Sequence, residues 1–339
     1  MSHEVMAFAT VDQLGYAATA MDLSAISTLA FFGLTASSKG TISLTGSGGK
    51  AWTSPTMTRV IARAHAAGTK IVPTLGRFSW NASGTQASRT LLASSAARAR
   101  LAAAIADIVV RRGVDGVNVD FEPIPHGQGK AFGGLVGEIR RALDARRPGL
   151  QLTVDLVGHF DSYDVPAIVA GKPDALYLMG YHYAGWWSKV AGSTAPLGGP
   201  RYDLVDTVRL LRRYVPADRI IVGVPYYGHL WPTTSSAVHA RTTGQGTDLR
   251  VSTALALATA HGLRWDPVEH VAWSRWQVRD CSTCALHWVE LYFDDPRAAA
   301  DKWAWVNRAG LLGTGIWTIG FEGTPSGWNR ELRRAFLAD

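Results

Sequence analysis

Eight short apolar stretches alternate along this chain with longer segments whose apolar residues recur every three or four positions. The short stretches are rich in Val, Ile and Leu, which is typical of parallel strands that are buried on both faces. The longer segments have the period of amphipathic helices, and several end just before a Gly or a Pro, as helices commonly do. The predicted strands are Val5–Thr10, Ile26–Gly33, Lys70–Leu75, Gly116–Phe121, Gln151–Val157, Ala175–Tyr181, Arg219–Pro225 and Gly313–Ile319. The predicted helices are Arg59–Ala67, Ala96–Arg112, Lys130–Arg147, Leu204–Tyr214 and Pro296–Ala309.

This alternation predicts an α/β fold of the (β/α)8 TIM barrel type rather than an open doubly wound sheet. A dinucleotide-binding sheet needs G-x-G-x-x-G directly after its first strand, and no such pattern follows Val5–Thr10. The Gly-rich stretch Gly46–Ala51 lacks the first Gly of a phosphate-binding loop, and it has Ala51 where that loop places Ser or Thr. We therefore interpret it as a flexible turn.

The strand spacing is regular except between the seventh and the eighth strand. The long intervening stretch contains a helix-like segment, Ser252–His261, and two alternating segments, Val271–Val278 and Ala285–Tyr292, so it does not read as a single crossover helix. We predict a catalytic barrel formed by residues 1–230 and 291–339, with a small α+β insertion at residues 231–290 between strand 7 and helix 7. Loops at this end of a barrel commonly carry function.

The charged residues bear on partners and location. The chain has 34 Lys and Arg against 27 Asp and Glu, a net charge of +7, but the basic residues are scattered, which argues against nucleic-acid binding. No apolar run approaches the ~18 residues of a membrane span. The first residues, Met1–Val5, lack the basic and apolar regions of a secretory signal. We therefore expect either a cytoplasmic protein or a secreted chain whose signal precedes this numbering.

The only two cysteines are Cys281 and Cys284. Two cysteines cannot staple a chain of this size, and without a second pair they do not make a zinc site. A short disulfide at the tip of a hairpin in the insertion is the preferred interpretation, and two free thiols are the alternative.

One predicted strand carries a row of polar side chains, within the segment D-G-V-N-V-D-F-E-P at Asp115–Pro123. Because side chains alternate between the faces of a strand, Asn118, Asp120 and Glu122 share one face, and the apolar residues between them share the other. The apolar face meets the helices of a barrel, so the polar row points inward. Burying these groups costs several kcal/mol unless they are paired. Their place near the carboxyl end of a strand favours a functional site over a structural network.

This row resembles the D-x-x-D-x-D-x-E signature of glycoside hydrolase family 18, the chitinase-type barrels, with Asn118 in place of the second Asp. Further segments resemble motifs of the same family in order and spacing. They are Pro73–Gly76 for the third strand, which matches poorly, Met179–His182 for M-x-Y-D, Gly223–Gly228 for G-x-P-x-Y-G, Gly313–Trp317 for G-x-x-x-W, and Leu291–Asp295 with Lys302 for the return to the barrel.

The resemblance implies roles for these residues. Glu122 is expected to be the general acid and base, while the 2-acetamido oxygen of the substrate replaces an enzyme nucleophile. Asp120 is expected to orient that acetamido group, to stabilise the positive intermediate and to disfavour ionisation of Glu122. Tyr181 is expected to hydrogen-bond the acetamido carbonyl, and Trp317 to pack beneath the sugar ring.

Two residues depart from the family pattern. Asn118 cannot share a proton with Asp120, but its amide is expected to donate a hydrogen bond that favours the ionised Asp120. Relatives resembling spore-cortex glucosaminidases also carry Asn at this position. His182 replaces an Asp, and because a His can titrate near neutrality we expect it to change the sugar subsite and the pH optimum.

Further residues complete the predicted substrate site. Trp80, Trp186 and Trp187 follow the third and sixth strands, where exposed aromatic rings can stack on sugars. The motif residues Met179, Tyr226 and Asp115 are also assigned to substrate binding. Asp155, within the fifth strand, either lines the barrel or forms an ion pair.

Three histidines, His159, His182 and His229, follow successive strands and raise the alternative of a metal-dependent hydrolase. Such barrels usually add H-x-H on the first strand, and Val5–Thr10 has no His. We therefore expect neither a metal ion nor a cofactor.

Taken with the resemblance, the sequence predicts a secreted or cell-wall-associated, monomeric, retaining glycosidase. Its expected substrate is a β-1,4-linked N-acetylglucosamine glycan, either chitin or peptidoglycan, and the positive charge suits adhesion to anionic cell-wall polymers. The alternatives are a non-catalytic chitinase-like carbohydrate-binding protein and a related hydrolase that is shifted to another glycan.

Overall fold

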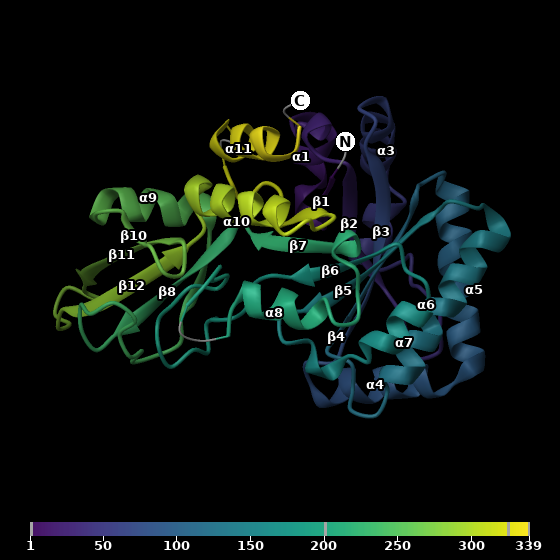
Figure 1. Ribbon diagram of the computed structural model, residues 1–339, viewed down its shortest axis with the longest axis horizontal. Coiled ribbons are helices and arrows are strands. Elements are labelled where there is room, and N and C mark those ends of the chain that lie inside the picture. The colour runs from purple at the N-terminus through teal and green to yellow at the C-terminus, as the bar shows by residue number, and fades with distance from the viewer. Residues whose placement is uncertain (1–2, 200–201, 324–325, 338–339) are drawn as a thin grey trace. The chain divides into compact units, whose positions relative to one another are not determined.

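Eight parallel strands form a closed barrel in the order β1-β13-β7-β6-β5-β4-β3-β2. The computed structural model describes residues 3–199, 202–323 and 326–337 (Figure 1). The barrel strands are β1 Glu4–Thr10, β2 Thr28–Thr35, β3 Lys70–Phe78, β4 Gly116–Glu122, β5 Gln151–Val157, β6 Ala175–Met179, β7 Ile220–Pro225 and β13 Gly313–Trp317. The predicted (β/α)8 barrel is confirmed, and each predicted strand overlaps an observed one. The sixth and eighth strands end earlier than predicted, so Tyr181 and His182 lie in the loop after β6.

Helices stand between the barrel strands, and α5, α6 and α7 lie side by side (Figure 1). The helix α5 ends at Gly113, which adopts a left-handed φ of +66° that Gly tolerates best. The helix α3 begins earlier than predicted, because Ser54 caps it and Pro55 suits its first turn. The helices of the chain are α1 Leu14–Thr19, α2 Ser47–Trp52, α3 Pro55–Ala66, α4 Ala82–Ala93, α5 Ser95–Arg112, α6 Gly129–Arg146, α7 Val165–Ala170, α8 Leu204–Leu211, α9 Val251–His261, α10 Pro296–Arg308 and α11 Ser326–Phe336.

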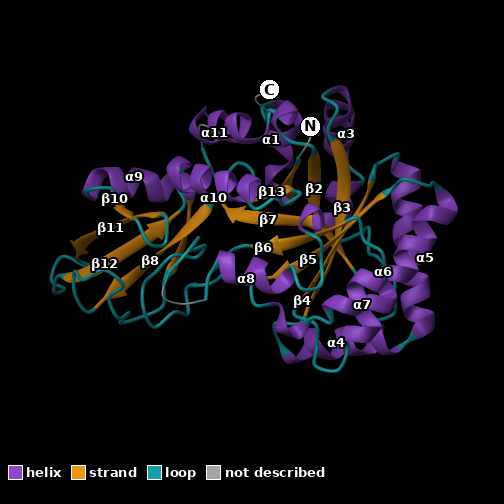
Figure 2. Ribbon diagram, viewed as in Figure 1, coloured by secondary structure: helices purple, strands orange, loops and turns teal. Residues whose placement is uncertain are grey.

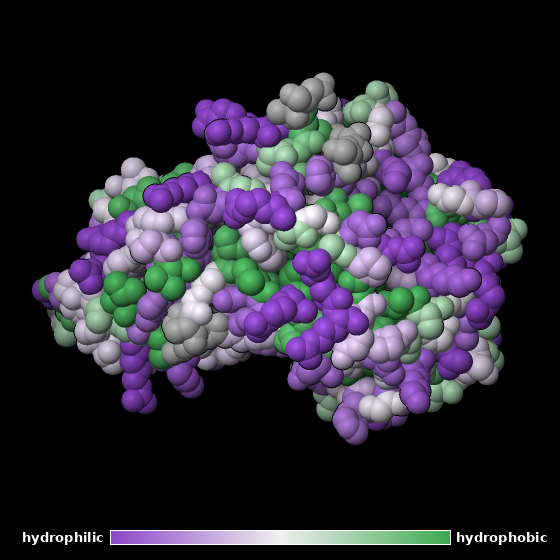
Figure 3. All heavy atoms as spheres, in the orientation of Figure 1, coloured by the Kyte–Doolittle hydropathy of each residue, from purple (hydrophilic) through white to green (hydrophobic). Residues whose placement is uncertain are grey.

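The barrel interior is filled by large side chains that pack against small ones. The ring of Tyr177 on β6 lies edge-on to Phe8 on β1, with 5.0 Å between the ring centroids. A Cβ atom at Gly315 on β13 would come within 2.0 Å of the Tyr177 ring, so only Gly fits there. On the outer side, the visible surface of α5 is mostly hydrophilic (Figure 3), as expected for a helix that buries one face against a sheet.

A second, five-stranded sheet has the order β10-β11-β12-β8-β9. The helix α9 packs against β8, β11 and β12 of this sheet (Figure 2). The predicted α+β insertion is therefore present as a sheet with one helix, and the sheet reaches from Tyr227 to Phe293. Its strands are β8 Tyr227–Thr233, β9 Thr247–Arg250, β10 Arg264–Asp266, β11 Val271–Val278 and β12 His287–Phe293.

The chain packs as two compact units, of which the first contains residues 1–178, 211–222 and 311–315, and the second contains the others. The second unit includes the five-stranded sheet together with residues of the loop between β6 and α8. The division into a barrel at 1–230 and 291–339 and an insertion at 231–290 stays a prediction.

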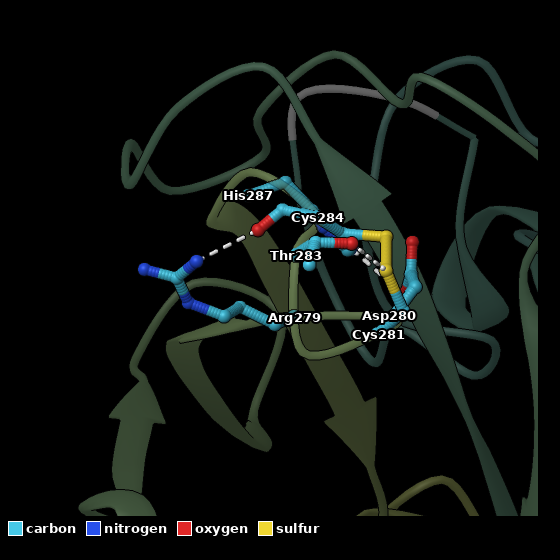
Figure 4. The surroundings of a disulfide bond; sticks show 6 residues. All are labelled: Arg279, Asp280, Cys281, Thr283, Cys284 and His287. Carbon is cyan, nitrogen blue, oxygen red and sulfur yellow. Dashed lines mark hydrogen bonds and ion pairs between the residues drawn. A yellow bond between two sulfur atoms is a disulfide. The ribbon is translucent and has the colours of Figure 1, made fainter.

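Cys281 and Cys284 form a disulfide in the turn between β11 and β12 (Figure 4). The Nη1 of Arg279 donates a hydrogen bond to the carbonyl of Cys284 at 2.8 Å and braces the same turn. The preferred interpretation of the two cysteines is thus confirmed. Separately, none of the helices in the described part of the chain is long and apolar enough to cross a bilayer.

Candidate active site

The polar row of β4 lies inside the barrel, as its alternation predicts. Asn118 is fully buried, Asp120 is 2% exposed, and Glu122 is partly exposed at the carboxyl end of the strand. The position of β4 depends on Gly116, because a Cβ atom there would meet the backbone oxygen of Gln151 on β5 at 2.0 Å. This close approach sets the register in which Asn118 pairs with Thr153 on β5.

Asn118 is held from both sides by the neighbouring strands. Its Nδ2 donates to the Oδ2 of Asp155 at 2.7 Å and to the Oγ1 of Thr74 at 3.3 Å. Its Oδ1 accepts a hydrogen bond from the Oγ1 of Thr153 at 2.7 Å. Both amide hydrogens are therefore engaged, and neither is directed to Asp120. This corrects the expectation that Asn118 donates to Asp120, because the nearest carboxylate acceptor for the amide is on β5.

The carboxyl groups of Asp120, Glu122 and Asp155 interact electrostatically. Burial raises the pKa of Glu122 to about 7, although a hydrogen bond with Asp120 acts in the opposite direction. Burial also raises the pKa of Asp120 well above its usual range, and the charges of Glu122 and Asp155 add to this increase. Because these groups are buried together, they cannot all ionise at neutral pH. A carboxyl group with a pKa near 7 is suited to act as both acid and base at neutral pH.

A groove of about 210 Å³ lies at the carboxyl ends of β2 and β3. Thr74, Gly76 and Phe78 of β3 line it, and in the strand register they pair with Asn118, Asp120 and Glu122. Trp80 is 68% exposed just beyond β3, and its ring stacks on that of Phe78 at 4.6 Å between centroids. Aromatic side chains next to a groove can pack against the flat faces of sugar rings.

The second unit holds a cluster of aromatic side chains after β6 and β7. The Tyr181 ring lies 5.4 Å from that of His182 and 6.0 Å from that of Tyr227, between centroids. The Trp187 ring lies 5.9 Å from His182 and edge-on to Trp186. Trp186 and Trp187 are 44% and 48% exposed, so both rings are available to a ligand.

The pKa of His182 differs from the value that the sequence suggests. Burial lowers its pKa to about 4, and the neighbouring His229 lowers it further, while Asp248 acts in the opposite direction. His182 is therefore neutral at physiological pH, which corrects the expectation that it titrates near neutrality. His229 itself is buried, and its Nε2 lies 3.0 Å from the Oδ1 of Asp248.

Two predicted substrate-binding residues lie away from these clusters. Asp115 precedes β4 at its amino end, where its Oδ2 accepts a hydrogen bond from the Ile71 amide at 2.8 Å and lies 2.9 Å from the Nε2 of His65. Barrel enzymes bind substrate at the opposite end of the strands, so this position does not fit substrate binding. Tyr226 is buried, 5.9 Å from the Trp328 ring between centroids.

Tyr227, rather than Tyr226, is the aromatic residue of this motif that contacts Tyr181 and His182. The motif G-x-P-x-Y-G already places its Tyr at position 227, and this signal could have identified it. Asp155 was predicted either to line the barrel or to form an ion pair, and the structure places it inside the barrel, hydrogen-bonded to Asn118. Two further predicted substrate-binding residues lie at the ends of barrel strands. Met179 is the last residue of β6 and is buried. Trp317 is the last residue of β13, and its carbonyl accepts a hydrogen bond from the Tyr226 amide at 2.7 Å.

A separate cluster in the second unit contains His239, Asp266 and Glu269. The Nε2 of His239 lies 3.2 Å from the Oδ2 of Asp266, and its Nδ1 lies 3.1 Å from the carbonyl of Ala191. Glu269 accepts a hydrogen bond from the Ser193 amide at 3.0 Å. Each of these three side chains thus has a contact within the protein.

A closed (β/α)8 barrel with carboxyl groups near the carboxyl end of one strand has the arrangement in which barrel enzymes carry their catalytic residues. The sequence model of glycosyl hydrolases family 18 matches residues 1–322, and the chain belongs to this family.

Relatives of this chain include a class V chitinase of Arabidopsis thaliana, which is 27% identical over 67% of this chain and 63% of that protein. A Bacillus subtilis protein with the name "Putative sporulation-specific glycosylase YdhD" is 26% identical over 74% of this chain and 57% of that protein. The chain thus spans little more than half the length of these curated relatives.

Solved structures share the fold over nearly the whole chain. A GH18 chitinase from Cycas revoluta in complex with (GlcNAc)3 has a TM-score of 0.82 and 18% identity, with 98% of this chain and 99% of that chain covered. A class V chitinase from Nicotiana tobaccum has a TM-score of 0.84 and 16% identity, with 99% of both chains covered.

Proposed function

We propose that this chain is a retaining glycosidase that hydrolyses β-1,4-linked N-acetylglucosamine glycans, with Glu122 as general acid and base. The observation that carries this proposal is the contact of partly exposed Glu122 with buried Asp120, in which the pKa of Glu122 is raised to about 7. An enzyme of this kind needs a carboxyl group that is protonated in one step and ionised in the next. Membership of family 18 and the chitin oligosaccharide bound by the Cycas revoluta relative support the substrate class.

In the first step, Glu122 donates its proton to the glycosidic oxygen, and the leaving sugar departs with that proton. The carbonyl oxygen of the substrate's own 2-acetamido group attacks the anomeric carbon and forms a positively charged oxazolinium ring. In the second step, the Glu122 carboxylate takes a proton from water, and the resulting hydroxide equivalent opens the ring at the anomeric carbon. Two displacements at the same carbon retain its configuration.

Asp120 supports both steps through its proton and its charge. Asp120 and Glu122 are proposed to share one proton. While this proton is on Asp120, Glu122 is ionised, and when the proton moves to Glu122, Glu122 can act as the general acid. The negative Asp120 then accepts the acetamido N–H and stabilises the oxazolinium charge. By resemblance to the family, Tyr181 hydrogen-bonds the acetamido carbonyl, and Trp317 packs beneath the sugar.

The exposed tryptophans Trp80, Trp186 and Trp187 are proposed as platforms for further sugar units, and Met179 and Tyr227 as walls of the site. The three tryptophan rings are exposed, Met179 is the last residue of β6, and Tyr227 is the first residue of β8. The protein is proposed to act as a secreted or cell-wall-associated monomer. The disulfide between Cys281 and Cys284 supports an oxidising compartment.

Glu122→Gln tests the proposal with a chito-oligosaccharide substrate and with peptidoglycan, using mass spectrometry to identify the products. Loss of the acid should reduce hydrolysis by at least about 100-fold. The matched control is Glu331→Gln in α11, where the carboxylate pairs with Arg330 and Arg334 at the surface. Unchanged hydrolysis by Glu122→Gln would contradict the assignment. NMR of the first product should show the β-anomer, and an inverted product would contradict the mechanism.

The alternative is a carbohydrate-binding protein without activity. The presence of Glu122 in a hydrogen bond with buried Asp120 argues against it, because a binding protein gains nothing from a carboxyl group poised near neutral pH. Tight binding of chito-oligosaccharides without cleavage at any pH would favour this alternative.

A further inference from the structure

The strand β5 contributes a third carboxyl group next to the proposed acid pair. Asp155 is 2% exposed, and β5 lies beside β4 in the barrel (Figure 1). In the register of the two strands, Val119 pairs with Val154, and Asp120 and Asp155 are the next residues along each strand. Neighbouring strands lie about 4.8 Å apart, so side chains on the same face at this level are close neighbours.

One oxygen of Asp155 is engaged by the amide of Asn118. The Nδ2 of Asn118 donates to the Oδ2 of Asp155 at 2.7 Å. Burial raises the pKa of the Asp155 carboxyl well above its usual range, while this hydrogen bond acts in the opposite direction and the charge of Glu122 adds to the increase. The orientation of the amide is determined by Thr153, whose hydroxyl donates to the Oδ1 of Asn118 at 2.7 Å. Among the described residues, the other oxygen of Asp155 has no hydrogen-bond partner.

Such an arrangement is costly for a purely structural residue. A carboxylate that is buried with one oxygen unpaired loses hydration without a full replacement. The titratable groups that face it are Asp120 and Glu122 on β4 and Tyr163 after β5, and all three interact with it electrostatically. The side chain of Tyr177 on β6 also occupies the barrel interior. No described cation appears among these interactions, so the Asp155 carboxyl competes with the two catalytic carboxyls for protons.

We propose that Asp155 is a positioning residue of the active site: it anchors the Asn118 amide, and its carboxyl group takes part in the proton sharing of Asp120 and Glu122. It thereby supplies, from the neighbouring strand, the extra carboxyl group that Asn118 cannot provide on β4. The inference rests on the proposed function, since it assigns Asp155 to the same reaction.

The test is the pH dependence of kcat/KM for Asp155→Asn with a chito-oligosaccharide. Asn has the same shape and can still accept the hydrogen bond from Asn118, so the variant removes the titratable carboxyl and changes little else. Removing a negative neighbour lowers the pKa of both catalytic carboxyls, because the ionised forms are no longer repelled. Both limbs of the bell-shaped profile should move to lower pH by about one unit, while KM stays within about twofold.

Thr153→Val is the matched control, because it removes a hydrogen bond to Asn118 without changing any charge. It should lower kcat modestly and leave both limbs in place. The exchange variant Asn118→Asp with Asp155→Asn moves the carboxylate to β4 and keeps a hydrogen bond between the two positions. It should return the limbs toward their wild-type positions.

Unmoved limbs in a folded Asp155→Asn variant would overturn the inference. A shift that the exchange variant does not reverse would also overturn it, because the effect would then come from packing and not from charge. If the wild-type protein cleaves no glycan, the proposed function fails, but the inference is still tested by carboxyl 13C NMR titration. In that case Asp120 and Glu122 should titrate at lower pH in Asp155→Asn than in the wild type, and equal titration would refute it.

Discussion

Replacing Glu122 by Gln should stabilise the folded protein at alkaline pH, although it removes the proposed general acid. Burial raises the pKa of Glu122 from 4.5 to about 7. A group whose pKa is higher in the folded state binds its proton more tightly there. Its contribution to stability is therefore complete below the unfolded-state pKa and is lost as the pH rises through the folded-state value. Gln does not titrate, so the variant does not lose this stability as the pH rises.

The size of the effect follows from the shift. The difference of 2.5 between 7 and 4.5, at about 1.4 kcal/mol per pKa unit, corresponds to about 3 kcal/mol in the free energy of unfolding. The stability gained by Glu122→Gln should approach this value at about pH 8. It should be below about 1 kcal/mol at about pH 5, where the wild type has not yet lost most of the stabilisation from the Glu122 proton. Because Glu122 shares protons with Asp120, the figure describes the pair.

The measurement is urea-induced unfolding of the wild type and Glu122→Gln at these two pH values, with Glu331→Gln on the surface as the control. The stability difference should grow with pH only for the Glu122 variant. If Glu122→Gln shows the same stability difference at both pH values, the raised pKa of Glu122 is refuted, and with it the electrostatic basis of the proposed acid.

Three further outcomes are expected. Trp187→Ala should raise the KM for chito-oligosaccharides about tenfold with kcat nearly unchanged, and an unchanged KM would contradict the role of this 48% exposed ring as a sugar platform. The double variant Cys281→Ser and Cys284→Ser should lose at most about 2 kcal/mol of stability by denaturant unfolding, because the disulfide closes a loop with a sequence separation of only 3; a larger loss would contradict this. Asp115→Ala should lower the midpoint of thermal unfolding, at a cost of about 1–3 kcal/mol, because the Ile71 amide loses its acceptor. A changed KM in that variant would instead support substrate binding by Asp115.

The barrel strands were predictable because each is buried on both faces and so carries a continuous apolar run. The strand Gln151–Val157 was predicted with the bounds that the structure shows. Short helices such as α1 and α7 were not predicted, since six residues are too few to display a helical period. The helix α3 was predicted too short, because its first turn depends on the cap at Ser54 and not on apolar spacing.

The carboxyl row on β4 was predictable for a similar reason. Its residues are two positions apart on one strand, so local geometry alone places Asn118, Asp120 and Glu122 on one face. Asp155 lies on another strand, and its hydrogen bond to Asn118 depends on the register between β4 and β5. Register is a property of the assembled sheet, which explains why Asp155 was left between two interpretations.

The sequence by itself determined the class of fold, the residue that can act as an acid and the family motifs, because these depend on composition, period and spacing along one chain. Only the tertiary structure decided the protonation of these residues. Burial moves the pKa of Glu122 up and that of His182 down, since a low-dielectric interior disfavours the charged form of each. It also decided that the Asn118 amide serves Asp155 and not Asp120, because a hydrogen bond forms with the partner that folding brings within reach.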